Sequence, residues 1–418
     1  MNWIQMPVSD SSGTTTQWIV VHSRLFLTGI LVAGLALNSL SQAPLTPRAM
    51  RDKAVAFEQQ GKVQEAEAAW KSISRLHPDN PEPYARIAVL ESRQEHYKEA
   101  APFYRKALAL NPNVPGLRLN LALALFKAGE MKDAIPEFEI LRKASPLSSP
   151  DYQRVTILLG MAHYGLAEYD KASPYLKEAA DRDSTNLTLL LALEHSYLWS
   201  NQSKYVLDVY RQILTLDPDS AEADMVAGEA LDEMKDNAGA TAMFRAAAKA
   251  GPKEPNVHFG LGYLLWTQKQ YAEAAQQFQA ELENDPKHAQ AKLYLADVYI
   301  QMNRLSEAEP MLRQVIQVDP SLPLAHLDLG IIASELGHNE EALREFKTAE
   351  KKTPDDVNVH WRLARLYRAM GNKEEAKAEF DKASTLNKKA DDDLYKKIKE
   401  GSAHPPAGTT PPSTPAHE

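Results

Sequence analysis

The chain has 418 residues, of which 44% are hydrophobic and 25% are charged, and its formal net charge is -9. This balance is typical of a folded protein and excludes general disorder. Lysine and arginine are interspersed with acidic residues, so no basic face for nucleic acid is expected. The sequence contains no cysteine, which excludes a disulfide framework, a thiolate metal site, a cysteine nucleophile and an acylated lipobox cysteine.

The N-terminal segment differs from the rest of the chain. Arg24 precedes an apolar run over residues 25–37, and small residues follow the run. This pattern predicts a secretory signal peptide over residues 1–41, cleaved after Ser41, and therefore a periplasmic or secreted protein. The apolar run is short against the ~20 residues that a membrane-spanning helix needs. The alternative is an uncleaved anchor, formed by residues 18–37, that holds the chain at the inner membrane.

Proline recurs along the chain at a spacing of 34 residues, with one slip of four residues. A strict period of this length is the signature of a solenoid of helix-turn-helix units. Setting the proline at position 32 of each unit defines ten units, over residues 47–80, 81–114, 115–148, 153–186 and then, contiguously, 187–390. The recurrent prolines are Pro78, Pro112, Pro146, Pro218, Pro252, Pro286, Pro320 and Pro354.

Other positions of the unit are also restricted. Position 8 is alanine or glycine in nine units and position 20 is alanine in nine, which lets two antiparallel helices approach closely. Position 24 is large, and we expect it to fill the space between neighbouring units, with aromatic residues in eight of them: Trp70, Tyr104, Phe138, Tyr210, Phe244, Phe278, Phe346 and Phe380. Unit five departs from the pattern at Glu194 and Val206. With the insertion just upstream, this predicts an irregular joint within residues 147–206.

These columns in a 34-residue unit resemble the tetratricopeptide repeat family, and the resemblance covers residues 47–390. It implies an all-α fold, a right-handed superhelical solenoid of antiparallel helix pairs. It also implies that the first helix of every unit lines a concave groove. The Lys and Asn carboxylate clamp of chaperone-binding members is not seen in units one and two, where the clamp columns hold Arg51, Val55, Ala85 and Val89.

The unit boundaries carry helix-end signals. Proline is expected at the first helical position at Pro81, Pro115, Pro255 and Pro323. Side-chain N-caps are expected at Asn80, Asn186, Ser220 and Asp356. Left-handed glycines are expected in the turn between paired helices at Gly61, Gly129, Gly337 and Gly371. After the array, residues 391–400 predict a solvating capping helix, and residues 401–418, rich in proline and threonine, predict a disordered tail.

No catalytic constellation is recognised in the sequence. Nucleotide-binding glycine loops, a zinc-protease helix, a nucleophile elbow and a calcium loop are all absent. His258, His326 and His360 share position 4, a column expected to be semi-exposed, and they are too far apart in sequence to form a metal site. We therefore expect a protein without enzymatic activity, cofactor or metal.

The groove positions implied by the resemblance are 2, 5, 9, 12 and 13 of each first helix, and many of them are apolar or aromatic here. One interpretation is a docking site for a protein or peptide, with aromatic anchors, an acidic band in unit six that selects a basic group, and a final arginine cluster that accepts a carboxylate. The alternative is that much of this stripe packs between adjacent first helices. The candidate residues are Phe126, Met161, Tyr164, Trp199, Glu229, Asp232, Tyr263, Trp266, Trp361, Arg362, Arg365 and Arg368.

Two functions follow from these observations. The first is an exported, non-enzymatic scaffold that binds protein or peptide partners in its groove. The second is a structural subunit of an envelope secretion or polysaccharide-export complex, held at the membrane by its N-terminal segment.

Overall fold

The computed structural model describes residues 46–402, and this part of the chain contains twenty α-helices and no strand. The signal peptide expected over residues 1–41 and nearly all of the expected tail lie outside the described residues. The helices are α1 (Pro47–Gln59), α2 (Val63–Leu76), α3 (Pro81–Arg93), α4 (Tyr97–Leu110), α5 (Leu117–Lys127), α6 (Met131–Ala144), α7 (Pro150–Gly165), α8 (Tyr169–Arg182), α9 (Leu187–Trp199), α10 (Ser203–Leu216), α11 (Ala221–Glu233), α12 (Asn237–Ala250), α13 (Val257–Thr267), α14 (Tyr271–Asn284), α15 (Ala289–Gln301), α16 (Leu305–Val318), α17 (Pro323–Glu335), α18 (Asn339–Lys352), α19 (Val357–Ala369) and α20 (Lys373–Ser402).

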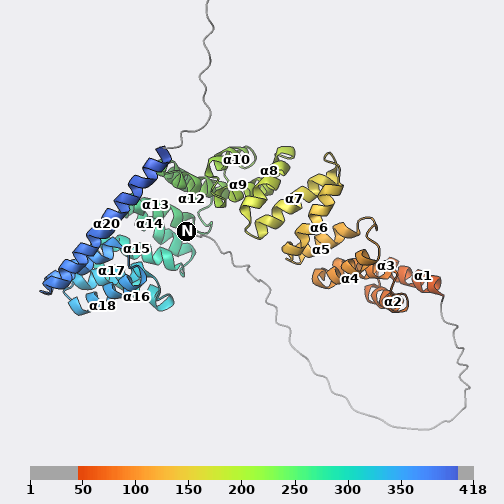
Figure 1. Cartoon of the computed structure of the whole chain (residues 1–418), viewed down its shortest axis with the longest axis horizontal. Coiled ribbons are helices and arrows are strands. Elements are labelled where there is room, and N and C mark those ends of the chain that lie inside the picture. Colours follow the sequence, from red (N-terminus) through yellow and green to blue (C-terminus); the bar gives the residue numbers. More distant parts are fainter. Residues whose placement is uncertain (1–45, 403–418) are drawn as a thin grey trace, which may run out of the picture.

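Each predicted unit forms one pair of helices, and successive pairs stack into a curved array (Figure 1). Every helix packs against its neighbours in sequence. First helices of successive units also contact each other, as α7 does with α9, α9 with α11, and α15 with α17. Second helices make no comparable contact within residues 46–402. The first helices therefore lie on the inner side of the curve, and we call their positions 2, 5, 9, 12 and 13 the inner face. The expected all-α solenoid is confirmed.

The four-residue insertion lengthens the first helix of unit four. Helix α7 has 16 residues, whereas the other first helices have 11 or 13. It begins at Pro150, and the Ser149 hydroxyl accepts a hydrogen bond from the Tyr152 amide at 3.1 Å. The insertion thus adds about one turn to the helix start. The flexible joint proposed for residues 147–206 stays a prediction.

The large residue at position 24 packs onto the small residue at position 8 of its own unit. A Cβ atom added to Gly330 would lie 2.4 Å from the Phe346 ring, and one added to Gly228 would lie 2.7 Å from the Phe244 ring. The position 24 side chains are buried in every unit except the fifth and the tenth. The Phe244 ring also reaches the next unit, because a Cβ atom added to Gly260 would lie 2.3 Å from this ring. Each such burial contributes roughly 2 to 3 kcal/mol to the stability of the array.

In unit five the residue at position 8 is large and buried, and the residue at position 24 is only partly buried. Glu194 occupies position 8 and is fully buried, and neither of its carboxyl oxygens has a hydrogen-bond partner. Tyr210, at position 24 of the same unit, is only half-buried and donates its hydroxyl hydrogen bond to Asp224 at 2.6 Å. We attribute the outward position of Tyr210 to the glutamate that fills the space of the missing glycine. Burial, reinforced by Glu222 and Asp224, raises the pKa of Glu194 to about 9.

Position 15, in the turn between paired helices, is left-handed in all ten units. The four predicted glycines have φ between 71° and 87°, as expected. The remaining six units place other residues there, with φ between 57° and 67°. This conformation disfavours side chains with a Cβ atom, so the sequence signal was visible only where glycine is present. The six residues are Glu95, Ala167, Asn201, Lys235, Lys269 and Asn303.

Several helix starts differ from the prediction. Pro81 and Pro323 begin α3 and α17 as expected, but α5 and α13 begin two residues after Pro115 and Pro255. In both cases the residue after the proline is left-handed, Gly116 with φ 73° and its counterpart in unit seven with φ 66°. A proline followed by a left-handed residue forms a type II turn, and this turn delays the helix. The amide of Leu117 bonds the carbonyl of residue 114 at 3.3 Å across the turn.

Three of the four predicted side-chain N-caps are confirmed and one is wrong. Asn80, Asn186 and Asp356 accept hydrogen bonds from first-turn amides as expected. Ser220 occupies the N-cap position of α11 but makes no side-chain capping bond, so that prediction is wrong.

The expected capping helix over residues 391–400 is not a separate element, because α20 runs without interruption from Lys373 to Ser402. Unit ten has Lys388 at position 32, where eight of the other nine units have proline, and no glycine or proline occurs between residues 373 and 400. Nothing in the sequence therefore stops the helix at the end of the unit. In Figure 1, α20 is the longest helix and runs along the C-terminal units. Within residues 46–402, no helix combines the length and the apolar character that crossing a membrane requires.

Each position 4 histidine links the two helices of its unit to the preceding unit, and we call this arrangement a histidine clip. The expectation of a semi-exposed column is wrong for two of the three histidines. His360 is fully buried and His326 is 8% exposed. Each Nδ1 bonds the glutamate at position 23 of its own unit at 2.7 Å, Glu379 for His360 and Glu345 for His326. Each Nε2 bonds the carbonyl of the recurrent proline of the preceding unit, at 2.7 Å and 3.1 Å. His258 makes the same bonds with a glutamine as partner. The clip explains why histidine recurs at position 4.

Candidate partner-binding site

The first aromatic group of the inner face lies on units four and five. Tyr164 on α7 stacks on Trp199 of α9 with ring centroids 6.3 Å apart, and His195 stacks on the same indole at 4.8 Å. Tyr169 at the start of α8 packs against Trp199 at 4.7 Å. Burial lowers the pKa of His195 to about 4, so this ring is neutral at physiological pH. Sequence reasoning identified Tyr164 and Trp199 but missed the histidine and Tyr169.

Two further candidates upstream serve mainly as packing. Phe126 on α5 is half-buried and meets the core ring of Phe138 edge-on, with centroids 6.3 Å apart. Met161 on α7 is half-buried and packs against the core of units four and five. These positions agree with the alternative in which part of the stripe is interior packing.

An acidic band follows on α11. Glu222 is exposed, whereas Glu229 and Asp232 are half-buried. Burial, reinforced by Glu233 and Asp232, raises the pKa of Glu229 to about 7. The positively chargeable group nearest to the band is the His195 ring, whose Nδ1 lies 3.7 Å from a Glu222 oxygen. The predicted acidic band is thus one continuous surface that begins beside the first aromatic group.

The second aromatic group lies on units seven and eight. The ring of Tyr294 on α15 meets Tyr263 at 5.4 Å and Trp266 at 5.0 Å, both edge-on. Tyr263 and Trp266 are themselves 5.7 Å apart on α13. Trp266 donates its indole N–H to the buried carboxylate of Asp297. Tyr263 and Trp266 are therefore brought together as predicted, with Tyr294 added from position 6 of the next unit.

A buried polar group lies between units eight and ten, and sequence reasoning missed it. Asp328 on α17 is 1% exposed, and its carboxylate has no hydrogen-bond partner. Burial and the nearby Asp297 raise the pKa of Asp328 well above its usual range, and Arg362 offsets this only in part. The one sequence signal is that Tyr294, Asp328 and Arg362 share position 6 of successive units, a column that is apolar or small in units four to seven.

The predicted arginine cluster of unit ten contains one half-buried arginine and two exposed ones. Arg362 is half-buried near Asp297 and Asp328, whereas Arg365 and Arg368 are exposed. Trp361 is 43% exposed, and the Arg365 guanidinium lies 4.7 Å from its ring centre. Only the exposed part of the cluster is available to an anionic group.

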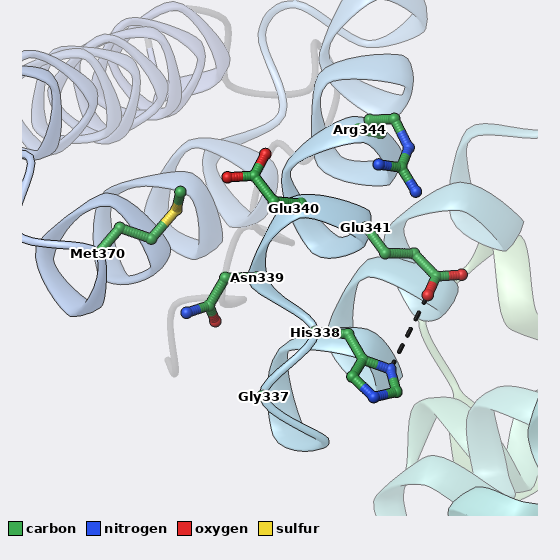
Figure 2. A pocket seen from close by; sticks show the side chains of 7 residues that line it. All are labelled: Gly337, His338, Asn339, Glu340, Glu341, Arg344 and Met370. Carbon is green, nitrogen blue, oxygen red and sulfur yellow. Dashed lines mark ion pairs between the residues drawn. The ribbon is translucent and has the colours of Figure 1, made fainter.

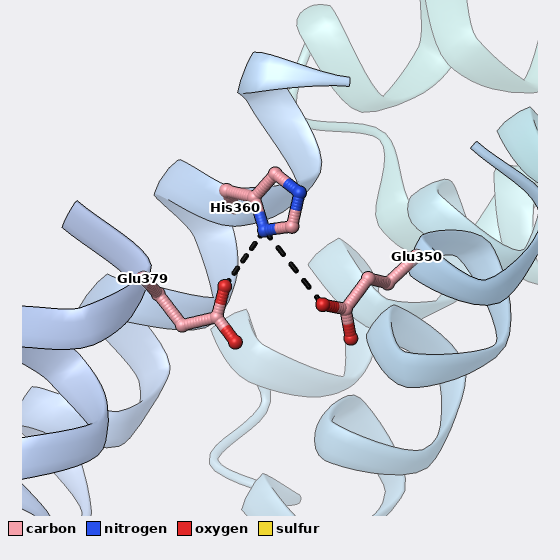
Figure 3. Close-up of side chains that lie close together, drawn as sticks. All are labelled: Glu350, His360 and Glu379. Atoms are coloured by element: carbon pink, nitrogen blue, oxygen red, sulfur yellow. Dashed lines mark hydrogen bonds and ion pairs between the residues drawn. The ribbon is translucent and has the colours of Figure 1, made fainter. Parts of the chain in front are cut away.

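One group of side chains could be taken for a metal site. Glu350, His360 and Glu379 place ligand atoms within 4.8 Å of each other, with the two carboxylates on either side of the imidazole (Figure 3). The Lys347 ammonium lies 2.9 Å from Glu350 and 3.0 Å from Glu379, so it already supplies the positive charge. Although burial opposes its charge, the bonds to both glutamates hold the pKa of Lys347 above its usual range. We interpret the group as the ionic part of the last histidine clip.

Two surface hollows in the described part of the chain are lined by no candidate residue. The first lies around the turn that leads into α18 (Figure 2). Figure 2 shows that Asn339, Glu340 and Glu341 point in different directions and do not converge on one point. The second lies between α6 and α8 and is lined by residues such as Ile135, Glu139 and Tyr175. Neither arrangement supports a catalytic centre.

The fold and this face define an α-solenoid repeat protein. Sequence models described as tetratricopeptide repeat match residues 92–156, 265–327 and 333–400, and a second set matches 33–81, 207–255 and 226–289. The chain belongs to the tetratricopeptide repeat family, as predicted. Repeats of this family imply a scaffold for protein-protein interaction, typically without enzymatic activity.

The chain is also similar, at low sequence identity, to solved structures. A tetratricopeptide repeat protein from Parabacteroides merdae is 18% identical, with a TM-score of 0.44, and the match covers 64% of this chain and 97% of the other. Pseudomonas aeruginosa PilF is 18% identical with a TM-score of 0.41 and coverages of 48% and 90%. YrrB, described as having an unusual peptide-binding site, is 18% identical with a TM-score of 0.36 and coverages of 42% and 91%. No curated protein matches the chain.

Proposed function

We propose that this protein is an exported, non-enzymatic scaffold that binds a protein or peptide partner on its inner face. The observation that carries the proposal is the continuity of that face: two aromatic groups, around Trp199 and Trp266, flank the acidic band of α11. Half-buried aromatic side chains on a rigid scaffold are the usual anchors of protein interfaces. The inner face therefore offers aromatic surface that a bound partner would bury, together with polar groups that fix the partner's orientation.

Export is proposed on the sequence alone. The apolar run over residues 25–37 with its flanking Arg24 and small residues supports a cleaved signal peptide. Sequencing the N-terminus of the mature protein tests this part. A start at Gln42 fits a periplasmic or secreted scaffold, whereas retention of residues 18–37 would favour the membrane-anchored subunit of an envelope complex.

Partner binding is tested by crosslinking in intact cells followed by mass spectrometry. The chain with Trp199→Ala or Trp266→Ala should lose the crosslinked partner, because each change removes an aromatic anchor. Tyr205→Ala is the matched control, since Tyr205 is a 41% exposed aromatic residue on the second helix α10. Equal capture by all variants, with unchanged helix content by circular dichroism, would show that the inner face is not the binding surface.

A further inference from the structure

Ion pairs are distributed unequally between the two faces of the solenoid. On the second helices, the arginine at position 25 repeatedly pairs with the acid at position 19 of the next unit. Arg245 lies 2.9 Å from Glu273, Arg313 lies 3.0 Å from Glu341, and Arg105 pairs with Asp133 in the same way. These three outer acids therefore have partners within the chain.

The acids of the inner face on α11 do not, in contrast to Glu82 at position 2 of unit two, which pairs with Arg51 at 2.7 Å. Among residues 46–393, whose side chains the structure describes, no lysine or arginine forms an ion pair with Glu222, Glu229 or Asp232. Of the cations on α10 and α12, Arg211 pairs with Asp208 and Arg245 pairs with Glu273, and neither Lys204 nor Lys249 forms an ion pair with these three acids. Closely spaced carboxylates repel each other, and a half-buried site screens this repulsion poorly. The band is thus a concentration of negative charge that the chain leaves uncompensated.

A second observation at the same place points in the same direction. Glu194 on α9 is completely buried beside Glu222 and Asp224, and both of its carboxyl oxygens lack a hydrogen-bond partner. Leaving a buried polar group unpaired costs about 1 to 3 kcal/mol. Burial, together with the negative charge of Glu222 and Asp224, raises the pKa of Glu194 to about 9 and keeps this carboxyl protonated at neutral pH. A cation placed against the band would relieve the negative potential that contributes to this shift.

The aromatic rings at both ends of the band suit the same kind of partner. A lysine or arginine side chain has an apolar stem and a cationic head, so it packs along rings while its charge faces acids or the ring plane. Tyr164 and Trp199 precede the band on α7 and α9, and Tyr263 and Trp266 follow it on α13. His195 beside Glu222 is neutral and does not compete for the site.

We infer that the inner face of units five to seven receives a cationic segment of the protein partner, with Glu222, Glu229 and Asp232 pairing with its lysine or arginine side chains and the flanking aromatic rings packing on their stems. This inference rests on the proposed function and specifies the chemistry of its partner. The pairing requires ionised carboxylates. Because the pKa of Glu229 is about 7, part of the binding is coupled to loss of one proton near neutral pH.

The charge state of Glu229 is set by its burial and by the acidic residues around it. Burial, and then Glu233 and Asp232 on its own helix, raise the pKa of Glu229. On the neighbouring first helices, His195 of α9 lies beside Glu222 and Tyr263 of α13 lies near Asp232. A bound cation lowers that pKa, so affinity should rise between pH 6 and pH 8. With a pKa near 7, the ionised fraction grows from about 10% to about 90%, which gives a gain of roughly fivefold to tenfold.

The test uses the full chain and a synthetic peptide, acetylated and amidated, of sequence Gly-Lys-Leu-Arg-Leu-Lys-Gly. In the control peptide, citrulline replaces arginine and norleucine replaces both lysines. Isothermal titration calorimetry should detect binding of the cationic peptide only, with affinity that falls as salt rises. The variant Glu222→Gln/Glu229→Gln/Asp232→Asn should bind at least tenfold more weakly. The matched control is Glu99→Gln/Asp170→Asn/Glu283→Gln, which removes three exposed acids from second helices and should bind normally.

Glu229→Gln alone should abolish the affinity gain between pH 6 and pH 8. Equal binding of both peptides, or unchanged affinity in the inner-face triple variant, would overturn the inference. The proposed function fails differently. If crosslinking captures a partner that depends on Trp199 and Trp266 but contacts this face through an acidic or uncharged segment, the scaffold function stands and the cationic segment is excluded.

Discussion

His360 lies with Nδ1 2.7 Å from a Glu379 carboxylate oxygen and with Nε2 2.7 Å from the carbonyl oxygen of Pro354. One buried ring thereby joins the two helices of unit ten to the recurrent proline of unit nine. The recurrent proline that defines the period in the sequence thus also supplies the carbonyl oxygen that the histidine ring contacts.

We predict that His360→Ala loosens the C-terminal end of the array. The change removes the partner of one Glu379 oxygen and of the Pro354 carbonyl, while Lys347 still pairs with the other Glu379 oxygen. Leaving a buried polar group unpaired typically costs about 1 to 3 kcal/mol. Hydrogen exchange of α19 and α20 amides should accelerate by at least tenfold. His258→Ala is the control, because its position is less buried and its Nδ1 partner is the neutral Gln277. Equal acceleration by both changes would refute a special role for the buried clip.

A second prediction concerns the stability of unit five as pH changes. Glu194 has an ordinary pKa of 4.5 when unfolded and about 9 when folded, so the folded state holds a proton that the unfolded state releases. Its contribution to stability is therefore full below pH 4.5 and is lost progressively as the pH rises toward 9. Glu194→Gln should flatten this decline. Thermal unfolding of both proteins at several values between pH 5 and pH 9 checks the prediction, and parallel curves would contradict it.

A third prediction concerns packing of position 8 on position 24. Gly330→Ala places a Cβ atom 2.4 Å from the Phe346 ring, so it should destabilise the protein by about 1 to 3 kcal/mol. Glu194→Ala, which restores the common residue of the column, should increase stability. Urea unfolding compares the two changes. Tolerance of alanine at position 330 would show that the ring can move aside.

A fourth prediction concerns the left-handed turn. Ala167 has φ 57° at the position where four units have glycine. Ala167→Gly removes steric strain at this position and should stabilise the protein by about 0.5 to 1 kcal/mol. The reverse change Gly129→Ala, at φ 78°, should destabilise it by a similar amount. The prediction fails if both changes shift the unfolding midpoint in the same direction.

The sequence was sufficient for the repeat and for most of its packing, because period and residue size are local properties that recur ten times. It was insufficient where a side chain from another unit decides the outcome. The histidine clips depend on partners 6 and 19 residues away, and the group formed by Asp297, Asp328 and Arg362 spans three units. The shifted starts after Pro115 and Pro255 depend on turn chemistry, since a left-handed residue after proline competes with the helix.

The candidate face was predicted in part for the same reason. Its columns follow from the repeat, so the sequence alone assigns Trp199, Glu229 and Trp266 to one surface. Which members are packing and which remain accessible depends on neighbouring helices. This explains why Phe126 and Met161 pack against the core while Trp361 remains 43% exposed.

Site-specific photocrosslinking in living cells tests the central claim most directly. A benzoylphenylalanine at Thr267, an exposed inner-face position beside Trp266, is compared with one at Tyr205 on the second helix α10. We predict a discrete crosslinked partner from position 267 that disappears in the Trp199→Ala background, and no such product from position 205. A product from position 205 alone, or equal products from both positions, would contradict binding at the inner face.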